Sequence, residues 1–296
     1  MTTHLIIGSR GSQLALWQAK HIAGRLKELG VATEIQIIKT TGDHLQTASL
    51  VQAGGKGLFT KEIEEALLAG SIDIAVHSLK DLPTENPPGL TIAAIPQRED
   101  ARDALAGRRL DELRQGARVG TSSNRRTAQL RILRPDLAIE PVRGNVDTRL
   151  RKLHEGQYDA IVLAAAGLRR LGLQNEIAEV FSPEQICPAP GQGALAIQTR
   201  AGDRAEEICR RLNHEETAKA VLCEREVLAA LGGGCQLPIG AYARVQGAIL
   251  TVQAGVFAPD GSRHVKASAE GGDPRELGQR VAGELITKGA QAICAL

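Results

Sequence analysis

The first two-thirds of the chain alternates short apolar segments with longer amphipathic ones, and this alternation constrains the fold more than any other feature. Short apolar runs bounded by turn residues are typical of buried strands, and apolar residues spaced by three and four are typical of helices that cover a sheet. From the N-terminus, the predicted strands are 5–7, 34–38, 72–76 and 90–95, and the predicted helices are 12–29 and 60–69. This order predicts a mainly parallel sheet with helices on its faces. Ser12 is the expected N-cap of the first helix, and Gly30 is its expected C′ residue.

A second unit with the same alternation begins near Glu99. Its predicted strands are 118–120, 139–142 and 159–163, and its predicted helices are 123–133 and 146–155. Prolines at 183, 188 and 190 then break the chain, and a further strand at 194–198 and a helix at 203–212 follow. Each unit opens with a strand, then a loop rich in Gly, Ser and Arg, then a helix; the two loops are 8–12 and 120–126. The shared arrangement predicts two similar α/β lobes that face each other across a cleft.

The residues from 215 onward follow a different pattern. A strong helical pattern over 215–231 ends at three glycines, a half-exposed strand is predicted at 249–257, and a last amphipathic helix at 273–288. We therefore expect three domains: 1–97 together with 194–214, then 98–193, then 215–296. The expected fold class is α/β, with two lobes like those of periplasmic binding proteins around a cleft and a small C-terminal α+β domain.

The overall charge excludes some classes of partner. The 296 residues include 36 basic and 34 acidic side chains, so a net charge of +2 gives no general attraction to nucleic acid or membrane. The N-terminus does not resemble a signal peptide, and no apolar run approaches the roughly 18 residues of a membrane span. We expect a cytoplasmic protein. Its five cysteines form no CxxC pair and no zinc-like spacing with histidine, which predicts free thiols and no metal.

Arginine is concentrated in the middle of the chain. From Arg98 to Arg151 there are thirteen arginines and no lysine, and several lie beside Gly or Ser. Arginine is favoured over lysine where a planar carboxylate or phosphate is held by two bonds. The same stretch has no aromatic residue on which a nucleic-acid base could stack, so a small anion fits better than nucleic acid. For any single arginine, a solvated surface position is the simpler interpretation.

Two further motifs belong to the first lobe. The glycine-rich segment 54–60 reads as a mobile flap that carries Lys56, although a plain surface turn explains it as well. At the end of strand 72–76, the run His77 to Pro83 places Asp81 at the edge where α/β sheets bind ligands. Nearby cations favour an ionised Asp81, which suits a carboxylate that steadies a cation better than a resting general acid. The alternative is a turn-stabilising Asp before Pro83, and His77 can equally be a structural histidine.

Cys235 follows Gly232, Gly233 and Gly234, so the chain around it is expected to be mobile and its thiol exposed. The other four cysteines suit the usual role of a small buried apolar side chain, and they are Cys187, Cys209, Cys223 and Cys294. The residues alone do not decide whether Cys235 is a nucleophile or an attachment point.

These motifs together resemble the porphobilinogen deaminase family over essentially the whole length. The resemblance rests on ordered motifs at 9–19, 54–59, 77–81, 120–126, 143–145, 190–194 and 233–235. It implies a dipyrromethane cofactor held by a thioether at Cys235. It also implies a monomeric transferase that joins four porphobilinogen molecules, with loss of ammonia, and releases hydroxymethylbilane for tetrapyrrole synthesis.

The resemblance also assigns roles to residues by position. Asp81 becomes the catalytic carboxylate, and Lys56 and Phe59 belong to a flap over the site. The residues expected to bind acetate and propionate groups are Arg10, Ser12, Lys80, Thr121, Ser122, Ser123, Arg125, Arg126, Arg143, Gly144, Arg149 and Arg170.

The chain departs from the family pattern in three places. Gln52 stands where many relatives carry Lys, Asn124 replaces a usual Leu, and Gly232 replaces a commoner Glu. Two rival classes remain: a non-enzymatic anion receptor, which usually needs an export signal and has no use for a mobile cysteine, and an RNA-binding module, whose affinity would depend steeply on salt.

Overall fold

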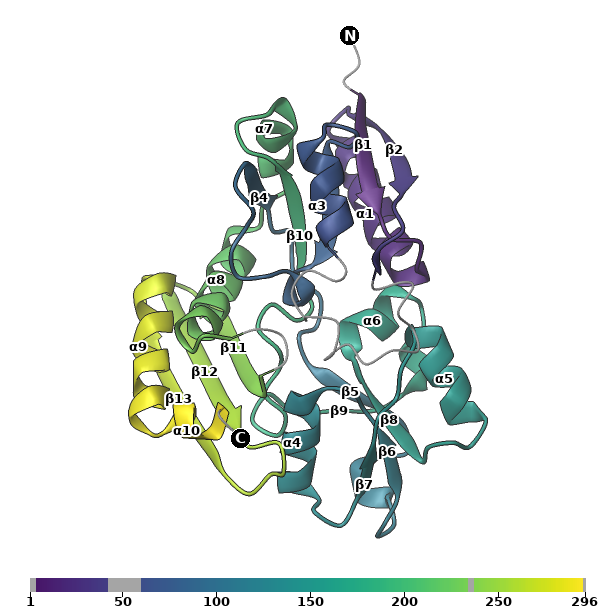
Figure 1. Ribbon diagram of the computed structural model, residues 1–296, viewed down its shortest axis with the longest axis vertical. Coiled ribbons are helices and arrows are strands. Elements are labelled where there is room, and N and C mark those ends of the chain that lie inside the picture. Colours follow the sequence, from purple (N-terminus) through teal and green to yellow (C-terminus); the bar gives the residue numbers. More distant parts are fainter. Residues whose placement is uncertain (1–3, 42–59, 234–236, 295–296) are drawn as a thin grey trace. The chain divides into compact units, whose positions relative to one another are not determined.

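The computed structural model describes residues 4–41, 60–233 and 237–294 (Figure 1). The chain divides into two compact units, the first made of 1–98 and 194–218 and the second of 99–193 and 219–296. The sequence-derived boundaries of three domains stay a prediction, and each unit is described here by itself. Within the described ranges, no helix combines the length and apolar character needed to cross a bilayer.

The first unit contains a five-stranded sheet in the order β2-β1-β3-β10-β4. The strands are β1 (His4–Ser9), β2 (Ala32–Ile37), β3 (Ile74–Ser78), β4 (Leu90–Ala94) and β10 (Leu195–Arg200). β1 is parallel to β2 and β3, whereas β10 is antiparallel to both β3 and β4. Four of the five strands therefore run in one direction, which confirms the mainly parallel sheet.

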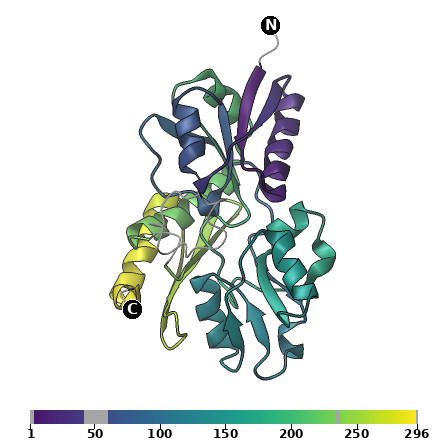
Figure 2. The ribbon, with the colours of Figure 1, turned by 45° about the vertical axis from the view of Figure 1, so that its right-hand side comes forward.

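Helices cover both faces of this sheet (Figure 2). They are α1 (Gln13–Glu28), α3 (Lys61–Leu68) and α7 (Arg204–Arg210). Ile74 and Val76 of β3 pack into one apolar core with α1 and α7, and Ala75 packs into another with α3. Adjacent side chains of a strand point to opposite faces, so the two cores lie on the two sides of the sheet. Ser12 accepts a bond from the Ala15 N–H, and Gly30 has a φ of +80°, as expected for the two ends of α1.

The second unit repeats this order in a second sheet, β7-β6-β8-β5-β9. Its strands are β5 (Asp103–Gly107), β6 (Arg118–Gly120), β7 (Ala138–Glu140), β8 (Ala160–Ala164) and β9 (Ile177–Val180), and its helices are α4 (Asn124–Leu133), α5 (Val146–His154) and α6 (Ala165–Arg170). β5 is antiparallel to both β8 and β9, as β10 is to its neighbours in the first sheet. The two sheets share one topology, which confirms the prediction of two similar lobes.

The C-terminal part of the second unit is an antiparallel sheet in the order β11-β12-β13. Its strands are β11 (Ile239–Gln246), β12 (Ile249–Phe257) and β13 (His264–Gly271), and its helices are α8 (Glu215–Ala230), α9 (Pro274–Thr287) and α10 (Ala290–Cys294). One face packs against these helices around residues such as Cys223, Val252 and Val281. This agrees with a small α+β domain, although the sequence predicted one strand where the structure has three.

Candidate functional site

In the first unit, two predicted site loops begin at the same edge of the sheet. β1 ends at Ser9 and the neighbouring parallel strand β3 ends at Ser78, so the loops that follow leave the sheet side by side. Gln18 of α1 donates to the Ser78 hydroxyl at 2.9 Å and ties the two together. Arg10, half-buried, lies in the first loop, and Ser12 uses its hydroxyl to cap α1.

Lys80 and Asp81 lie in a single 3₁₀ turn, Leu79–Asp81, directly after β3. The turn is anchored by Leu79, whose side chain is fully buried and whose N–H donates to the Ala194 carbonyl at 3.0 Å. The Asp81 residue itself is exposed. An anchored turn therefore presents Asp81 to solvent.

His77 is buried instead. Its Nε2 atom lies 3.0 Å from the Gln198 side-chain oxygen, and the Gln198 amide donates in turn to Glu64 at 3.0 Å. Burial lowers the pKa of His77 to about 4, and the bond to Gln198 offsets only part of that effect. The imidazole is neutral near pH 7, and its hydrogen bond links β3 to β10 and, through Gln198, to α3. His77 is therefore a structural histidine, one of the two interpretations that the sequence allowed.

In the second unit, the corresponding loops also follow strands that run in one direction. β6 is parallel to β7 and β8, so the segments after Gly120, Glu140 and Ala164 begin at one edge of the sheet. Thr121 is buried and accepts a bond from the Ser123 N–H, while Ser123 caps α4 by accepting from the Arg126 N–H. The exposed Ser122 donates to the Val142 carbonyl at 2.8 Å and joins two of these loops.

Arg125 and Arg126 are both buried and share one carboxylate, that of Asp103. Arg125 donates to one oxygen at 2.7 Å, and Arg126 donates twice to the other, at 2.7 and 3.0 Å. Burial alone would raise the pKa of Asp103, but the charges and hydrogen bonds of the two guanidiniums outweigh it and hold that pKa well below its usual range.

The loop between β7 and α5 contributes Arg143 and Gly144, and the second turn of α5 contributes Arg149. Arg149 donates from Nε to the Gly144 carbonyl at 2.8 Å, and Arg143 is exposed. Gly144 has a φ of +111°, and a Cβ at this position would lie 2.6 Å from the Thr148 side chain. Glycine is therefore required for the loop to close against α5.

Arg170 is the last residue of α6 and is also buried. Its Nη2 atom donates to the Gly193 carbonyl at 2.6 Å. Burial lowers the pKa of Arg170 to about 10, despite the opposing charge of Glu99, so the side chain stays cationic at neutral pH. These four arginines thus lie in helices that follow the carboxyl ends of parallel strands of the second sheet, and backbone carbonyls and Asp103 hold them: Arg125, Arg126, Arg149 and Arg170.

Three predicted residues, Lys56, Phe59 and Cys235, lie outside the described residues. Three of the other cysteines show whether a different thiol could hold a ligand. Cys187, Cys209 and Cys223 are free and buried, and burial raises the pKa of each thiol to about 12. These three thiols are inert small side chains, as predicted, and none of them suits covalent attachment of a ligand.

Sequence reasoning missed Asp103 and Gln192. Gln192 donates to Asp103 at 2.9 Å and to the Ala101 carbonyl at 2.7 Å. Two adjacent arginines in the first turn of α4 were a usable signal, because buried guanidiniums require compensating partners such as a buried carboxylate. Strand β5 was not predicted from the sequence, and this antiparallel strand brings Asp103 to the edge of the second sheet at which β8 ends.

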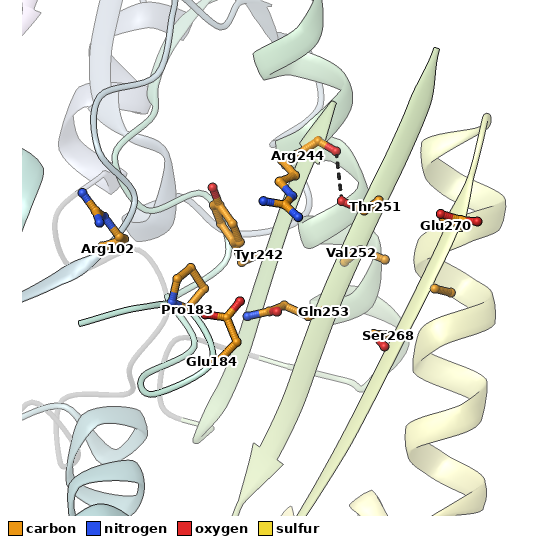
Figure 3. Close-up of a pocket in the computed structure, with 11 residues that line it drawn as sticks. Arg102, Pro183, Glu184, Tyr242, Arg244, Thr251, Val252, Gln253, Ser268 and Glu270 are labelled. Atoms are coloured by element: carbon orange, nitrogen blue, oxygen red, sulfur yellow. Dashed lines mark hydrogen bonds between the residues drawn. The ribbon is translucent and has the colours of Figure 1, made fainter. Parts of the chain in front are cut away.

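The structure also shows a pocket of about 620 Å³ on the open face of the three-stranded sheet (Figure 3). Tyr242, Arg244 and Gln253 point from the sheet toward the loop that carries Pro183 and Glu184. No residue singled out from the sequence lines this pocket. Its lining includes two arginines, Arg102 and Arg244, and two glutamates, Glu184 and Glu270, so its charges are mixed and favour no particular class of ligand.

The comparisons with known proteins agree with each other. Residues 5–208 match the family model described as "Porphobilinogen deaminase, dipyromethane cofactor binding domain", and residues 218–287 match "Porphobilinogen deaminase, C-terminal domain". The porphobilinogen deaminase of Thiobacillus denitrificans is 50% identical, covering 98% of this chain and 97% of the relative. That of Deinococcus deserti is 49% identical, covering 97% and 96%.

Some solved structures share a distant likeness with the chain. A periplasmic substrate-binding protein of an ABC transporter from Coxiella burnetii is 14% identical with a TM-score of 0.43, covering 70% of this chain and 91% of that one. A putative lipoprotein from Actinomyces odontolyticus is 14% identical with a TM-score of 0.43, covering 72% and 90%. Values this low say nothing of function.

Proposed function

Because the chain belongs to the porphobilinogen deaminase family, we propose that it is a transferase that joins four molecules of porphobilinogen head to tail. Each addition releases ammonia, and water finally releases hydroxymethylbilane, a precursor of tetrapyrroles. The observation that carries the proposal is the match of both family models along the chain, combined with the arginines held at one end of the second sheet.

The donor set suits a polycarboxylate ligand. Each pyrrole of the substrate brings an acetate and a propionate, so a growing chain accumulates negative charge. Arg125, Arg126 and Arg170 are buried cations, Arg143 lies in the loop before α5, and Arg149 in α5 donates to the carbonyl of Gly144 in that loop. Buried guanidiniums with fixed orientation favour bidentate contacts with carboxylates. A pocket for a single anion would not require so many arginines.

The same donors fit the dipyrromethane cofactor, which carries the same carboxylates. When bound, it supplies the pyrrole to which the first substrate molecule is joined. We assign its attachment to Cys235. Burial with a pKa raised to about 12 makes Cys187, Cys209 and Cys223 unsuitable for attachment. The resemblance at Gly233, Gly234 and Cys235 supports the same assignment.

Asp81 is proposed as the catalytic carboxylate. It is exposed on an anchored turn at the carboxyl end of β3, where ligands of α/β sheets bind. When porphobilinogen loses ammonia, its methylene carbon becomes cationic, and a nearby carboxylate would stabilise that charge and accept bonds from pyrrole N–H groups. Lys80 and Arg10, at the same edge, would hold substrate carboxylates.

The remaining residues would hold and enclose the ligand. Ser12, Thr121, Ser122 and Ser123 add hydroxyl or backbone donors at the helix starts, and Gly144 lets the backbone approach closely. Lys56 and Phe59 are assigned to a flap. Attaching the growing product to the protein makes each addition effectively intramolecular, which lowers the entropic part of the barrier. We also propose a cytoplasmic monomer that binds neither nucleic acid nor membrane.

Intact-mass spectrometry of the purified protein tests the proposal directly. We expect an added mass equal to two pyrrole units, located on the peptide that contains Cys235, and consumption of porphobilinogen with release of ammonia. Folded protein that carries no added mass and leaves porphobilinogen unchanged would refute the function. An added mass on another cysteine would leave the reaction intact but reassign the attachment site.

A further inference from the structure

One edge of β13, the last strand of the C-terminal sheet, has no strand beside it. Within the part of the chain that the structure describes, β13 pairs with β12 alone. Helix α9 packs against β13 in the same unit (Figure 1). A strand at the edge of a sheet presents backbone N–H and carbonyl groups to which another strand can bond. What covers these groups therefore decides whether this edge binds another chain.

The register of the sheet identifies the residues whose backbone groups point to the free edge. The Ala243 N–H of β11 donates to Glu224 of α8 at 2.8 Å, so Ala243 does not bond to β12. Its partner on β12, Val252, must then bond on its other side, to Ala269 of β13. Because the direction of bonding alternates along a strand, the residues on either side of Ala269 point away from β12. By this alternation, the residues that face the free edge are Lys266, Ser268 and Glu270.

Two cationic side chains of α9 bond to this edge. Arg280 Nη2 donates to the Glu270 carbonyl at 2.6 Å, and Lys288 Nζ donates to the Lys266 carbonyl at 2.9 Å. Both acceptors are among the residues that the register assigns to the free edge. Cationic side chains on an edge strand are one means by which proteins prevent the pairing of sheets. Here the cations come from a neighbouring helix and bond directly to the carbonyls of the strand.

The same two carbonyls are acceptors that a second copy of β13 would need. If two such strands lay antiparallel with Ser268 opposite Ser268, Lys266 of each copy would lie opposite Glu270 of the other. In a hydrogen-bonded pair of this kind, each residue donates its N–H to the carbonyl of the other residue. These bonds would displace Arg280 and Lys288 from the edge.

The side chains of the edge would also match in this pairing. Figure 3 shows Ser268 and Glu270 on β13 at the open face of the sheet, and Lys266, two residues before Ser268, belongs to the same row. All three residues are exposed. Opposite charges directly across a pair of strands attract each other, so each lysine would meet a glutamate of the other copy.

We propose that the free edge of β13 is a self-complementary surface for a second copy of this chain, and that Arg280 and Lys288 hold it closed. The charge pattern determines the choice of occupant, since Lys266 and Glu270 lie evenly about Ser268 and match when two copies pair antiparallel. The inference goes beyond the proposed function and uses no residue of the candidate site. It gives a physical basis for the monomer proposed above.

Removing both side chains of α9 tests the proposal. Arg280 and Lys288 are exposed, so the variant that combines Arg280→Ala with Lys288→Ala should fold, which thermal unfolding checks. Sedimentation equilibrium of the full-length holoenzyme at a series of concentrations gives the Kd of the dimer. Each substitution acts twice in a symmetric dimer, and one charge-assisted bond is worth roughly tenfold, so Kd should fall about 100-fold for each substitution and about 10⁴-fold for both.

The matched control combines Arg275→Ala with Lys219→Ala. It removes the same two positive charges from exposed positions, and Arg275 forms an ion pair with the Glu226 side chain, not with the strand. This control is needed because a lower net charge can by itself promote association. It should keep the wild-type Kd. A control that associates as strongly as the variant without Arg280 and Lys288 would overturn the proposal, because charge alone would then explain the effect.

Two further changes, each made in the variant without Arg280 and Lys288, locate the surface. Ser268→Pro removes the N–H at the centre of the free edge but no bond to β12, and it should restore the monomer. Lys266→Glu would set two glutamates opposite each other and should raise Kd about tenfold, and adding Glu270→Lys should reverse this. Lys266 also donates to the Glu184 carbonyl at 3.4 Å. Both of these variants lose that bond, so a recovery reports the pairing of the two copies.

The remaining outcomes would each refute the proposal. A variant without Arg280 and Lys288 that stays monomeric at the highest concentration reached would show that the edge is not a surface for a second copy. A dimer that survives Ser268→Pro, or that ignores the exchange of charges, forms through another surface. A wild type that Ser268→Pro alone converts from dimer to monomer would show that the two side chains of α9 do not hold the edge closed.

Discussion

The Nε2 atom of His77 lies 3.0 Å from the Oε1 atom of Gln198, inside the first unit. Because the Gln198 amide nitrogen donates to Glu64, its oxygen is the acceptor, and the neutral imidazole donates to it from Nε2. The three side chains join β3, β10 and α3 beneath the turn that carries Asp81. The buried histidine therefore supports the edge of the site without taking part in proton transfer at neutral pH.

This arrangement predicts a pH dependence of stability. Burial lowers the pKa of His77 from 6.5 to about 4, so between these values the unfolded chain binds a proton that the folded chain does not. The contribution is complete above pH 6.5 and is lost as the pH falls toward 4, by about 3 kcal/mol. In urea unfolding at a series of pH values, His77→Gln should flatten this decline. His4→Gln, at the exposed start of β1, should not. Equal slopes for His77→Gln and the wild type would contradict the assignment.

Replacing Asp81 by Asn should separate catalysis from folding. Asp81 is exposed, so we expect the free energy of unfolding to change by less than about 0.5 kcal/mol. Loss of the carboxylate charge should lower kcat roughly 10²- to 10⁴-fold. Steady-state kinetics with porphobilinogen and thermal unfolding measure the two effects. Asp111→Asn, which removes another exposed carboxylate, should leave kcat unchanged. Near-wild-type turnover in Asp81→Asn would remove Asp81 from its proposed role.

Replacing Cys235 by Ser should abolish stable cofactor attachment. A hydroxyl is a far weaker nucleophile than a thiolate, and Cys187, Cys209 and Cys223 are buried with raised pKa values, so none of them should substitute. The intact mass of Cys235→Ser should equal that of the bare chain. Cys209→Ser is the matched control and should keep the added mass. A Cys235→Ser protein that still carries the cofactor would require a different anchor.

Much of the fold follows from local patterns in the sequence. Helix α1 was predicted within one residue of its observed ends, because its apolar spacing and the capping residue Ser12 mark it, and strand β6 was predicted with its observed ends. β5 and β9 were missed, because nothing local in the sequence signals pairing with a distant strand. β11 and β13 flank the predicted β12, and their alternation is weakened by small and charged residues.

In the candidate site too, some features could be predicted from local sequence patterns and others depend on residues far apart in the chain. The sequence was sufficient to propose candidate anion sites in the loops after strands 5–7 and 118–120. In both places a strand is followed by a polar loop and a helix, which puts a helix N-terminus at the edge of the sheet, and such an N-terminus favours anions. The burial of Arg125 and Arg126 could not be predicted, because it depends on Asp103, more than twenty residues earlier on an antiparallel strand. Partners brought together by topology leave no local signal.

Gly193 gives the last prediction, which concerns the segment that receives Arg170. Gly193 has a φ of +83°, and a Cβ there would meet the Glu99 carbonyl and lie 3.0 Å from the Asp100 carbonyl, both of them backbone atoms. Gly202 has a φ of +76° with open space around it, so it is a matched control for the cost of the left-handed conformation alone. Gly202→Ala should cost about 1 kcal/mol in unfolding free energy, and Gly193→Ala on the order of 3 kcal/mol. Denaturant unfolding of both variants measures the difference. Equal costs would mean that the backbone around Glu99 yields freely, and the Gly193 carbonyl would then not be a fixed acceptor for Arg170.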